Sequence, residues 1–217
     1  MMSLAIIDCG SGNLRSAAKA FEKMSAGSIR EIHVTKCPDL VSKSDQIVLP
    51  GVGSFPDFKK GMSSISGLRE SLEEQVMKRG KPFMGICVGM QLMADMGYEY
   101  SMTSGLGWLP GEVSKIDPNQ KGSEVNLKVP HMGWNSLSFK DSTHPCLNGI
   151  EHGSYVYFVH SFHLRLKQET DLIATTQYGD MLTAIAGRDN IIGTQFHPEK
   201  SQEIGLRLIK NFLAWRP

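Results

Sequence analysis

A cysteine between two glycines is the first feature of this sequence that could do covalent chemistry. The stretch FMGICVGMQLM, residues 83–93, places Cys87 between Gly85 and Gly89. This is the pattern of a nucleophile elbow, a strained turn from strand to helix that holds the nucleophile at its apex. The helix N-terminus would favour the thiolate, and the Val88 N–H would bind an oxyanion. Because cysteine is also among the most buried residue types, this pattern alone leaves catalysis and packing equally open.

The segment TQFHPEKS, residues 194–201, offers a base for such a nucleophile. In an extended segment residues i and i+2 lie on one side, so His197 and Glu199 project together, and Pro198 keeps His197 extended. A carboxylate beside an imidazole fixes its tautomer and stabilises its protonated form, as in nucleophile–His–acid triads. None of the other six histidines has a carboxylate two residues later. The alternative is a strand end whose polar side chains simply meet water.

A second oxyanion donor is expected in PGVGSF, residues 50–55. Gly51 and Gly53 leave the peptide groups between them free to reorient, so the Val52 N–H could face the reacting carbonyl. The segment follows an apolar strand, at the carboxyl edge where open α/β sheets bind ligands. An ordinary Pro-Gly turn is the alternative.

The elements that must position these residues follow from the hydrophobic pattern. In the first half, short apolar runs alternate with amphipathic segments, which is typical of βαβ units around a parallel sheet. We expect strands at residues 4–7, 32–34, 46–49 and 83–86, and helices that include residues 17–21 and 68–76.

The second half has a different texture. Shorter β-like runs predict antiparallel additions to the sheet at residues 112–116, 135–139 and 155–159. Runs at 182–186 and 191–196 flank a hairpin turn, and a last helix carries apolar residues from 204 to 212. With no linker or repeat, we expect one α/β domain over residues 1–217. Its architecture would be an open, mostly parallel sheet flanked by helices, with additional antiparallel strands in the C-terminal half.

Charge and cysteine content narrow the function classes. The 23 Lys+Arg residues nearly balance the 22 Asp+Glu residues, which argues against nucleic-acid or membrane-surface binding and favours a small molecule or a protein as partner. The N-terminal apolar run ends at Asp8, too short for a signal peptide or a membrane span, so we expect a cytoplasmic protein. The four cysteines are widely spaced, so we expect reduced thiols and no metal. Arg15 occupies the third glycine position of a dinucleotide fingerprint, so no nucleotide cofactor is expected.

With GICVGMQL, FHPEKS and LPGVGSF in this order and spacing, the chain resembles the class I, triad-type glutamine amidotransferases over essentially its whole length. This family hydrolyses glutamine through a γ-glutamyl thioester and passes the ammonia to a synthase. The resemblance implies a flavodoxin-like fold, with Cys87 as nucleophile, His197 as the base that later protonates the leaving ammonia, and Glu199 as the residue that orients His197.

The same resemblance assigns substrate contacts. Gly53, Val88 and Gln91, with the backbone at Ser161 and Phe162, fall where the family grips its glutamine substrate. The residues Val159-His160-Ser161-Phe162 end a β-like run, which is consistent with a place beside the triad.

Two further stretches are similar to one branch of the family, the glutaminase subunits of imidazole glycerol phosphate synthases, which act in histidine biosynthesis. They are IIDCGSGNLRS at 6–16 and the more discriminating VPHMGWNSL at 129–137. The similarity implies a heterodimer with a separate (β/α)₈-barrel cyclase subunit. It places Asn13, Met132, Trp134 and Lys200 near the mouth that faces this partner. Helix capping, core packing and solvated charge are their alternative roles.

Other functions stay open at this point. The same glutaminase chemistry could serve another synthase, such as a sugar amidotransferase, or a Cys-His-Glu triad could cleave γ-glutamyl amides or peptides. A degenerate, binding-only protein is disfavoured because all three triad positions are filled. One departure from the branch is Cys9, which stands where an aromatic residue is common, and we interpret it as a packing change.

Overall fold

The computed structural model describes residues 2–10, 14–25, 30–117, 127–139 and 144–217. Asn13, one of the expected interface residues, lies outside these ranges. The core of the described chain is a seven-stranded sheet. Its strands lie in the order β11 (Leu172–Tyr178), β12 (Asp180–Arg188), β13 (Ile191–Thr194), β4 (Phe83–Cys87), β3 (Gln46–Gly51), β1 (Met2–Ile7) and β2 (Arg30–Thr35).

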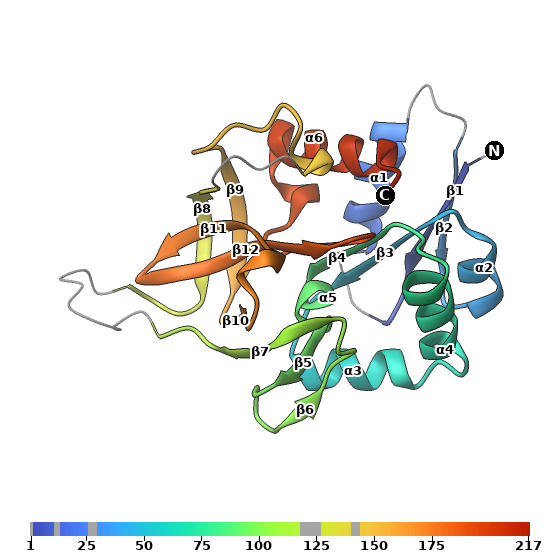
Figure 1. The fold of residues 1–217 in the computed structure, drawn as a ribbon, viewed down its shortest axis with the longest axis horizontal. Helices are drawn as coiled ribbons and strands as arrows, with labels where there is room; N and C mark the ends of the chain where they lie inside the picture. Colours follow the sequence, from blue (N-terminus) through green and yellow to red (C-terminus); the bar gives the residue numbers. More distant parts are fainter. Residues whose placement is uncertain (1, 11–13, 26–29, 118–126, 140–143) are drawn as a thin grey trace.

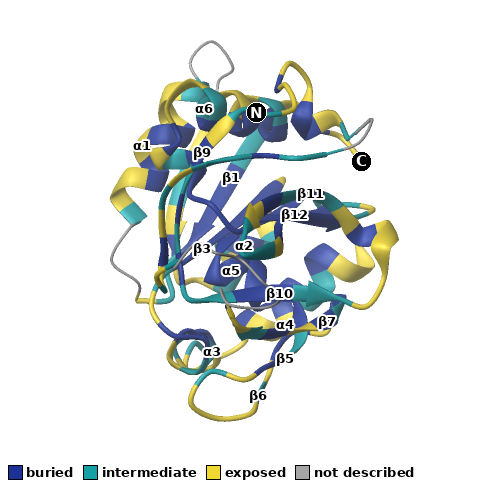
Figure 2. Cartoon of the chain, turned by 90° about the vertical axis from the view of Figure 1, so that its left-hand side faces the viewer, coloured by how far each residue is buried: buried dark blue, intermediate teal, exposed yellow. Residues whose placement is uncertain are grey.

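Neighbouring strands from β13 to β2 pair in parallel, and β12 and β11 continue the sheet in antiparallel pairing. Every residue of β3 and β4 is buried, as expected for strands covered on both faces by helices. The buried strands run through the centre of the molecule, and the outer faces of the helices are exposed (Figure 2). The predicted parallel core and the hairpin from β12 to β13 are therefore confirmed.

Helices cover both faces of this sheet (Figure 1). On one face lie α1 (Leu14–Ser25) and α6 (Gln202–Ala214), joined by the edge-to-face rings of Phe21 and Phe212, 6.3 Å apart. On the other lie α2 (Pro38–Lys43), α3 (Phe55–Ser63), α4 (Leu68–Leu72) and the π-helix η1 (Glu73–Lys78). The predicted helix over 68–76 is thus an α-helical turn that continues as a π-helix, with Leu68, Leu72 and Val76 all buried.

The predicted antiparallel strands at 112–116, 135–139 and 155–159 are present, but they form no strand of the main sheet, so their expected place in it was wrong. The one link to that sheet among these described residues is an isolated antiparallel bridge between Ser138 and Thr175 of β11. The first of the three runs contributes to a four-stranded sheet in the order β10 (Phe162–Leu166), β7 (Leu109–Lys115), β5 (Ala94–Gly97) and β6 (Thr103–Ser104). The other two form a separate antiparallel pair, β8 (His131–Ser136) and β9 (Tyr155–His160). Buried and more exposed residues alternate along β9, so one face of this strand lies toward solvent. A central strand of the main sheet has no such face, because helices cover both sides of that sheet.

The remaining described elements are one-turn helices: α5 (Val88–Gln91), η2 (Pro145–Leu147), η3 (Glu169–Asp171) and η4 (Pro198–Lys200). Two of them, α5 and η4, follow the carboxyl ends of the adjacent parallel strands β4 and β13. Among the residues described, no helix is long and apolar enough to cross a membrane.

Glycines allow the backbone after β4 to turn tightly against β3. A Cβ on Gly89 would lie 1.9 Å from the Leu49 carbonyl oxygen, and one on Gly85 would lie 2.6 Å from the Gly89 carbonyl oxygen. Since no side chain fits at such distances, both positions require glycine.

We therefore expect Gly89→Ala to lower the free energy of unfolding by about 3 kcal/mol or more, because the Leu49 backbone must move. The control is Gly153→Ala, where the glycine has a positive φ, +84°, but open space around its Cβ position. That variant should lose only about 1–2 kcal/mol from backbone strain. Urea denaturation of both variants measures the difference, and equal losses would contradict the steric explanation.

Candidate active site

Cys87 ends β4 with a strained backbone, at φ 55° and ψ −110°. Such a conformation is costly for a residue with a side chain and clusters at functional sites. The helix that follows, α5, is a single turn. Its macrodipole is correspondingly small, so the expected help to the thiolate comes from individual N–H groups such as that of Val88.

His197 and Glu199 lie together, as the sequence pattern indicated, but a different local structure joins them. His197 Nδ1 is 2.8 Å from Glu199 Oε1, and both side chains are 2% exposed. His197 has an extended backbone, whereas η4 begins at Pro198, and the Lys200 N–H donates to the His197 carbonyl. The i to i+2 contact therefore arises from a 3₁₀ turn and not from an extended segment, which corrects the predicted geometry.

The surroundings of His197 favour its protonated form. Burial lowers the pKa of the imidazole, but hydrogen bonds to Cys87 and Glu199, together with their charges, outweigh this effect and raise the pKa from 6.5 to about 10. The two ring nitrogens of His197 thus connect the Cys87 sulfur to the Glu199 carboxylate. This arrangement suits an imidazolium beside a thiolate, the resting pair of a cysteine nucleophile and its general acid–base.

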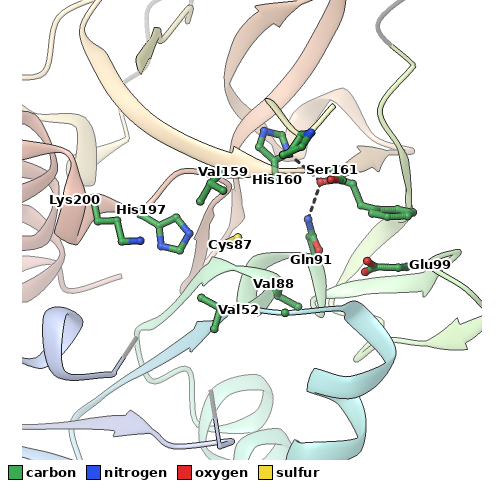
Figure 3. Close-up of a pocket in the computed structure, with 13 residues that line it drawn as sticks. Val52, Cys87, Val88, Gln91, Glu99, Val159, His160, Ser161, His197 and Lys200 are labelled. Atoms are coloured by element: carbon green, nitrogen blue, oxygen red, sulfur yellow. Dashed lines mark hydrogen bonds between the residues drawn. The ribbon is translucent and has the colours of Figure 1, made fainter. Parts of the chain in front are cut away.

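A pocket opens beside Cys87, with a volume of about 310 Å³. Figure 3 shows Cys87 and His197 at one end, Val52 and Val88 along one wall, and Gln91 and Glu99 toward the other end. The wall brings together all the residues expected to bind oxyanion or substrate, and Lys200. They are Val52, Gly53, Val88, Gln91, Ser161, Phe162 and Lys200.

The glycines beside Val52 have different reasons to be glycine. A Cβ on Gly51 would lie 2.6 Å from the Gly89 nitrogen, so Gly51 is needed for close packing against the elbow. Gly53 has φ +92° and nothing within 4 Å of its Cβ position. The sequence suggested that both glycines let the Val52 peptide reorient. In the structure only Gly53 has open space for such a movement, because Gly51 is tightly packed.

Much of the backbone at Ser161 and Phe162 is already bonded within the protein. The Ser161 carbonyl accepts from Ile116 N–H, and the Phe162 carbonyl accepts from Gln91 Nε2 at 2.8 Å. Gln91 Nε2 also donates to Gln195 Oε1 at 3.0 Å. Because both amide hydrogens of Gln91 are used, its oxygen is the atom it can offer to a ligand.

Sequence reasoning assigned no individual role to four residues of the pocket wall and one behind it, although it placed the run that contains Val159 and His160 beside the triad. Glu99, Pro130, Val159 and His160 line the pocket. Glu99 accepts a hydrogen bond from Phe55 N–H at 2.7 Å, and burial raises the pKa of its carboxyl. Gln195 is fully buried, and its Nε2 lies 3.6 Å from Cys87 Sγ. Its position directly before FHPE was the available signal, but the apolar run at 191–196 indicates only the end of a strand there.

Of the expected interface residues that the structure describes, Lys200 lines the pocket, whereas Met132 and Trp134 lie outside it. Met132 and Trp134 project from β8 with 61% and 46% of their surface exposed. Trp134 packs edge-to-face on Tyr157 at 6.0 Å, and Lys200 Nζ lies 5.9 Å from the centre of the same Tyr157 ring. Through Tyr157 and Lys200, this surface is therefore continuous with the pocket.

A family model described as glutamine amidotransferase class-I matches residues 5–215. The chain belongs to this family. Full-length relatives are the imidazole glycerol phosphate synthase subunits HisH of Rhodospirillum rubrum, 52% identical over 218 residues, and of Agrobacterium fabrum, 51% identical over 221 residues. Each alignment covers 100% of both chains.

Solved structures of glutamine amidotransferases share the fold. A structure titled glutamine amidotransferase is 18% identical, with a TM-score of 0.68 and coverage of 97% of both chains. The glutaminase domain of Trypanosoma brucei CTPS with bound acivicin is 12% identical, with a TM-score of 0.65, and covers 100% of this chain and 96% of that one. The α/β fold class expected from the sequence is therefore confirmed.

Two other thiols of this glutamine amidotransferase differ from Cys87 in their surroundings. Burial, helped by Asp8, raises the pKa of Cys9 to about 12, and burial raises the pKa of Cys146 to about 12. Cys9 packs against the core, as its interpretation as a packing residue requires. Within the described ranges, no group of three or more His, Cys, Asp and Glu side chains is arranged to hold a metal ion.

The histidines of this glutamine amidotransferase should titrate far apart. His197 should stay protonated through neutral pH and lose its proton near pH 10, whereas His131, whose pKa burial lowers to about 4, should stay neutral until about pH 4. Because the folded-state pKa of His197 lies above 6.5, its protonation stabilises the fold fully below pH 6.5 and progressively less as the pH rises through 10.

NMR of the imidazole carbons measures both titrations. Cys87→Ala should lower the pKa of His197, because it removes one of the interactions that raise it, and should leave His131 unchanged as an internal control. A wild-type His197 that titrates near 6.5, or one that is unaffected by Cys87→Ala, would contradict the ion-pair description.

Proposed function

We propose that this chain is the glutaminase subunit of an imidazole glycerol phosphate synthase in histidine biosynthesis. It hydrolyses L-glutamine to glutamate and ammonia and supplies the ammonia to a separate cyclase subunit. The observation that carries the proposal is the identity of about half of all residues with HisH subunits along the full length of both chains. The contact of a buried His197–Glu199 pair with Cys87 supplies the chemistry.

The reaction begins when the Cys87 thiolate attacks the side-chain amide carbon of glutamine. The N–H groups of Val52 and Val88 bind the negative charge that develops on the carbonyl oxygen. The His197 imidazolium gives its proton to the amide nitrogen, the C–N bond breaks, and ammonia leaves. A γ-glutamyl thioester on Cys87 and a neutral His197 result.

The second half-reaction restores the resting pair. Neutral His197 takes a proton from water as the oxygen attacks the thioester carbonyl carbon. The C–S bond breaks, glutamate is released, and Cys87 returns to the thiolate beside an imidazolium. Glu199 holds the His197 ring in orientation throughout and stabilises its charged form.

The far end of the pocket suits the amino-acid part of glutamine. The Glu99 carboxylate and the free oxygen of Gln91 are acceptors in the pocket wall, and they complement the three N–H donors of an α-ammonium group. Gly53 offers backbone close to the substrate without a side chain in the way. These contacts favour free glutamine over a peptide, whose α-nitrogen carries no charge.

The partner is expected on the β8 side. Ammonia released into neutral water becomes unreactive ammonium, so the two active sites need a closed passage between them. We propose that a (β/α)₈-barrel cyclase covers Met132, Trp134 and Lys200 and forms a heterodimer with this chain. It would combine the ammonia with a phosphorylated ribulosyl-aminoimidazole-carboxamide intermediate, to yield imidazole glycerol phosphate and an aminoimidazole carboxamide ribotide.

The partner would also control the rate. Losing one oxyanion donor costs about 10²- to 10³-fold in rate. Gly53 has open space around it, so the Val52 peptide can rotate there and turn the glutaminase activity on or off. We expect the isolated chain to be nearly inactive until the partner binds its own ligand.

Cys87→Ala tests the proposal. With the cyclase and its phosphorylated substrate present, the variant should lose synthesis from glutamine, because no thioester can form, and keep synthesis from added ammonium salt. Formation of imidazole glycerol phosphate from each nitrogen source is measured.

The control is Cys37→Ala, which removes an exposed thiol and should keep both activities. Loss of both activities in Cys87→Ala would mean that Cys87 supports the fold or the interface instead. Wild-type protein that makes no imidazole glycerol phosphate with the cyclase would point to another synthase.

A further inference from the structure

A chain of hydrogen bonds leads through the protein interior to the sulfur of Cys87. Gln195 Nε2 lies 3.6 Å from Cys87 Sγ, within hydrogen-bond range for sulfur, and Gln195 Oε1 accepts from Gln91 Nε2 at 3.0 Å. Gln195 is 0% exposed and Gln91 is 3% exposed. The sulfur therefore has a polar neighbour besides His197, on a side chain that water does not reach.

Which end of the Gln195 amide faces the sulfur follows from the Phe162 carbonyl. A carbonyl oxygen only accepts hydrogen bonds, and this one accepts from Gln91 Nε2 at 2.8 Å and from His160 Nδ1 at 2.9 Å. Turning the Gln91 amide over would bring two oxygens together. The NH₂ group of Gln91 therefore donates to the side-chain oxygen of Gln195. The NH₂ group of Gln195 then faces the Cys87 sulfur.

The Phe162 carbonyl is itself held by a pair of histidines. His160 donates from Nδ1 to that carbonyl, so in its neutral form its Nε2 accepts, here from His131 Nδ1 at 2.9 Å. His131 Nε2 then accepts from Asn135 Nδ2 at 3.2 Å. Burial lowers the pKa of His160 to about 3 and that of His131 to about 4, so both are neutral near pH 7 and the direction of every bond is fixed.

We propose that Gln195 is a further catalytic residue, whose amide N–H donates a hydrogen bond to the Cys87 thiolate and is held in that orientation by Gln91 and the Phe162 carbonyl. The inference deepens the proposed function, because it rests on Cys87 as the nucleophile. A fixed donor favours the thiolate over the thiol, since it offers the thiol hydrogen no acceptor. The same bond stabilises the sulfur anion that leaves when water cleaves the thioester.

Other titratable groups share this environment, and their effects must be separated from that of Gln195. His197 faces the sulfur, with Glu199 behind it, and His160, Glu99 and Lys200 line the same pocket. All of them remain in a variant that changes only Gln195. A difference in the pH dependence of Cys87 reactivity between that variant and the wild type therefore reports on the Gln195 amide.

The test is the rate of Cys87 alkylation by iodoacetamide as a function of pH, followed on the Cys87 peptide by mass spectrometry. It uses the full chain and needs neither glutamine nor a partner. In Gln195→Leu the rate below neutral pH should fall about tenfold, and the midpoint of the profile should move to higher pH, because a charge-assisted hydrogen bond is lost. A purely structural role for Gln195 would leave the midpoint unchanged.

Gln46→Leu is the matched control. Its amide is also buried, 1% exposed, and it donates to the Phe212 carbonyl at 2.9 Å, away from the pocket. It should lose stability as Gln195→Leu does and keep the wild-type alkylation profile. A wild-type profile in Gln195→Leu would overturn the inference, as would an equal shift in Gln46→Leu.

A second variant, Gln195→Glu, keeps the side-chain size if the leucine variant does not fold. Its carboxylate still accepts from Gln91 but offers the sulfur no N–H, so the rate below neutral pH should again fall at least about tenfold. An unchanged profile in this variant overturns the inference and leaves the proposed function standing. A wild-type Cys87 that iodoacetamide does not alkylate at any pH would overturn both.

Discussion

The close approach of the Gly89 backbone to the Leu49 carbonyl is the constraint on which the active site depends. It lets the chain leave β4 in a tight turn, and Cys87 takes up the strain of that turn at φ 55°. Because β3, β4 and β13 are parallel neighbours, their carboxyl ends meet at one edge of the sheet. The Val52 loop, the proposed nucleophile Cys87 and His197 lie at or just beyond these ends, so one packing contact aligns three parts of the proposed chemistry.

Electrostatic differences between histidines show how the same side chain serves opposite purposes here. Burial lowers the pKa of His160 and His131. These two histidines bond to each other and to uncharged groups, so they stay neutral and form fixed links in a hydrogen-bond chain. Burial acts on His197 in the same direction, but Glu199 and Cys87 reverse the outcome. His160, backed by His131, holds the Phe162 carbonyl, whereas the charged His197 is the ring proposed to transfer protons.

Sequence patterns predicted the parts of the fold and site that depend on neighbouring residues. The buried strands, the elbow between two glycines and the nearness of His197 to Glu199 all follow from residues within one short segment. The sheet to which β7, β8 and β9 belong did not follow, because strand pairing is decided by partners far along the chain. The 3₁₀ turn at Pro198 was missed because it gives the same contact as an extended segment.

The residues missed at the site share a cause. Glu99 follows β5 in a stretch with no motif, and it enters the pocket because Phe55 N–H holds its carboxylate. Gln195 resembles the end of an apolar strand, and its proposed role depends on a hydrogen bond from Gln91, which is 104 residues away in the chain. In both cases the chemistry is set by one hydrogen bond between distant segments, which a single sequence does not display.

The most direct test of this description is to trap the covalent intermediate. The protein, with the cyclase and its phosphorylated ligand bound, would be mixed with isotopically labelled glutamine, quenched in acid within the first turnover and digested for mass spectrometry. The γ-glutamyl label should appear on the peptide that contains Cys87, and it should be lost on treatment with hydroxylamine, as a thioester is. Steady glutamate release with no label on Cys87, or with the label on another residue, would contradict the assignment of Cys87 as the nucleophile.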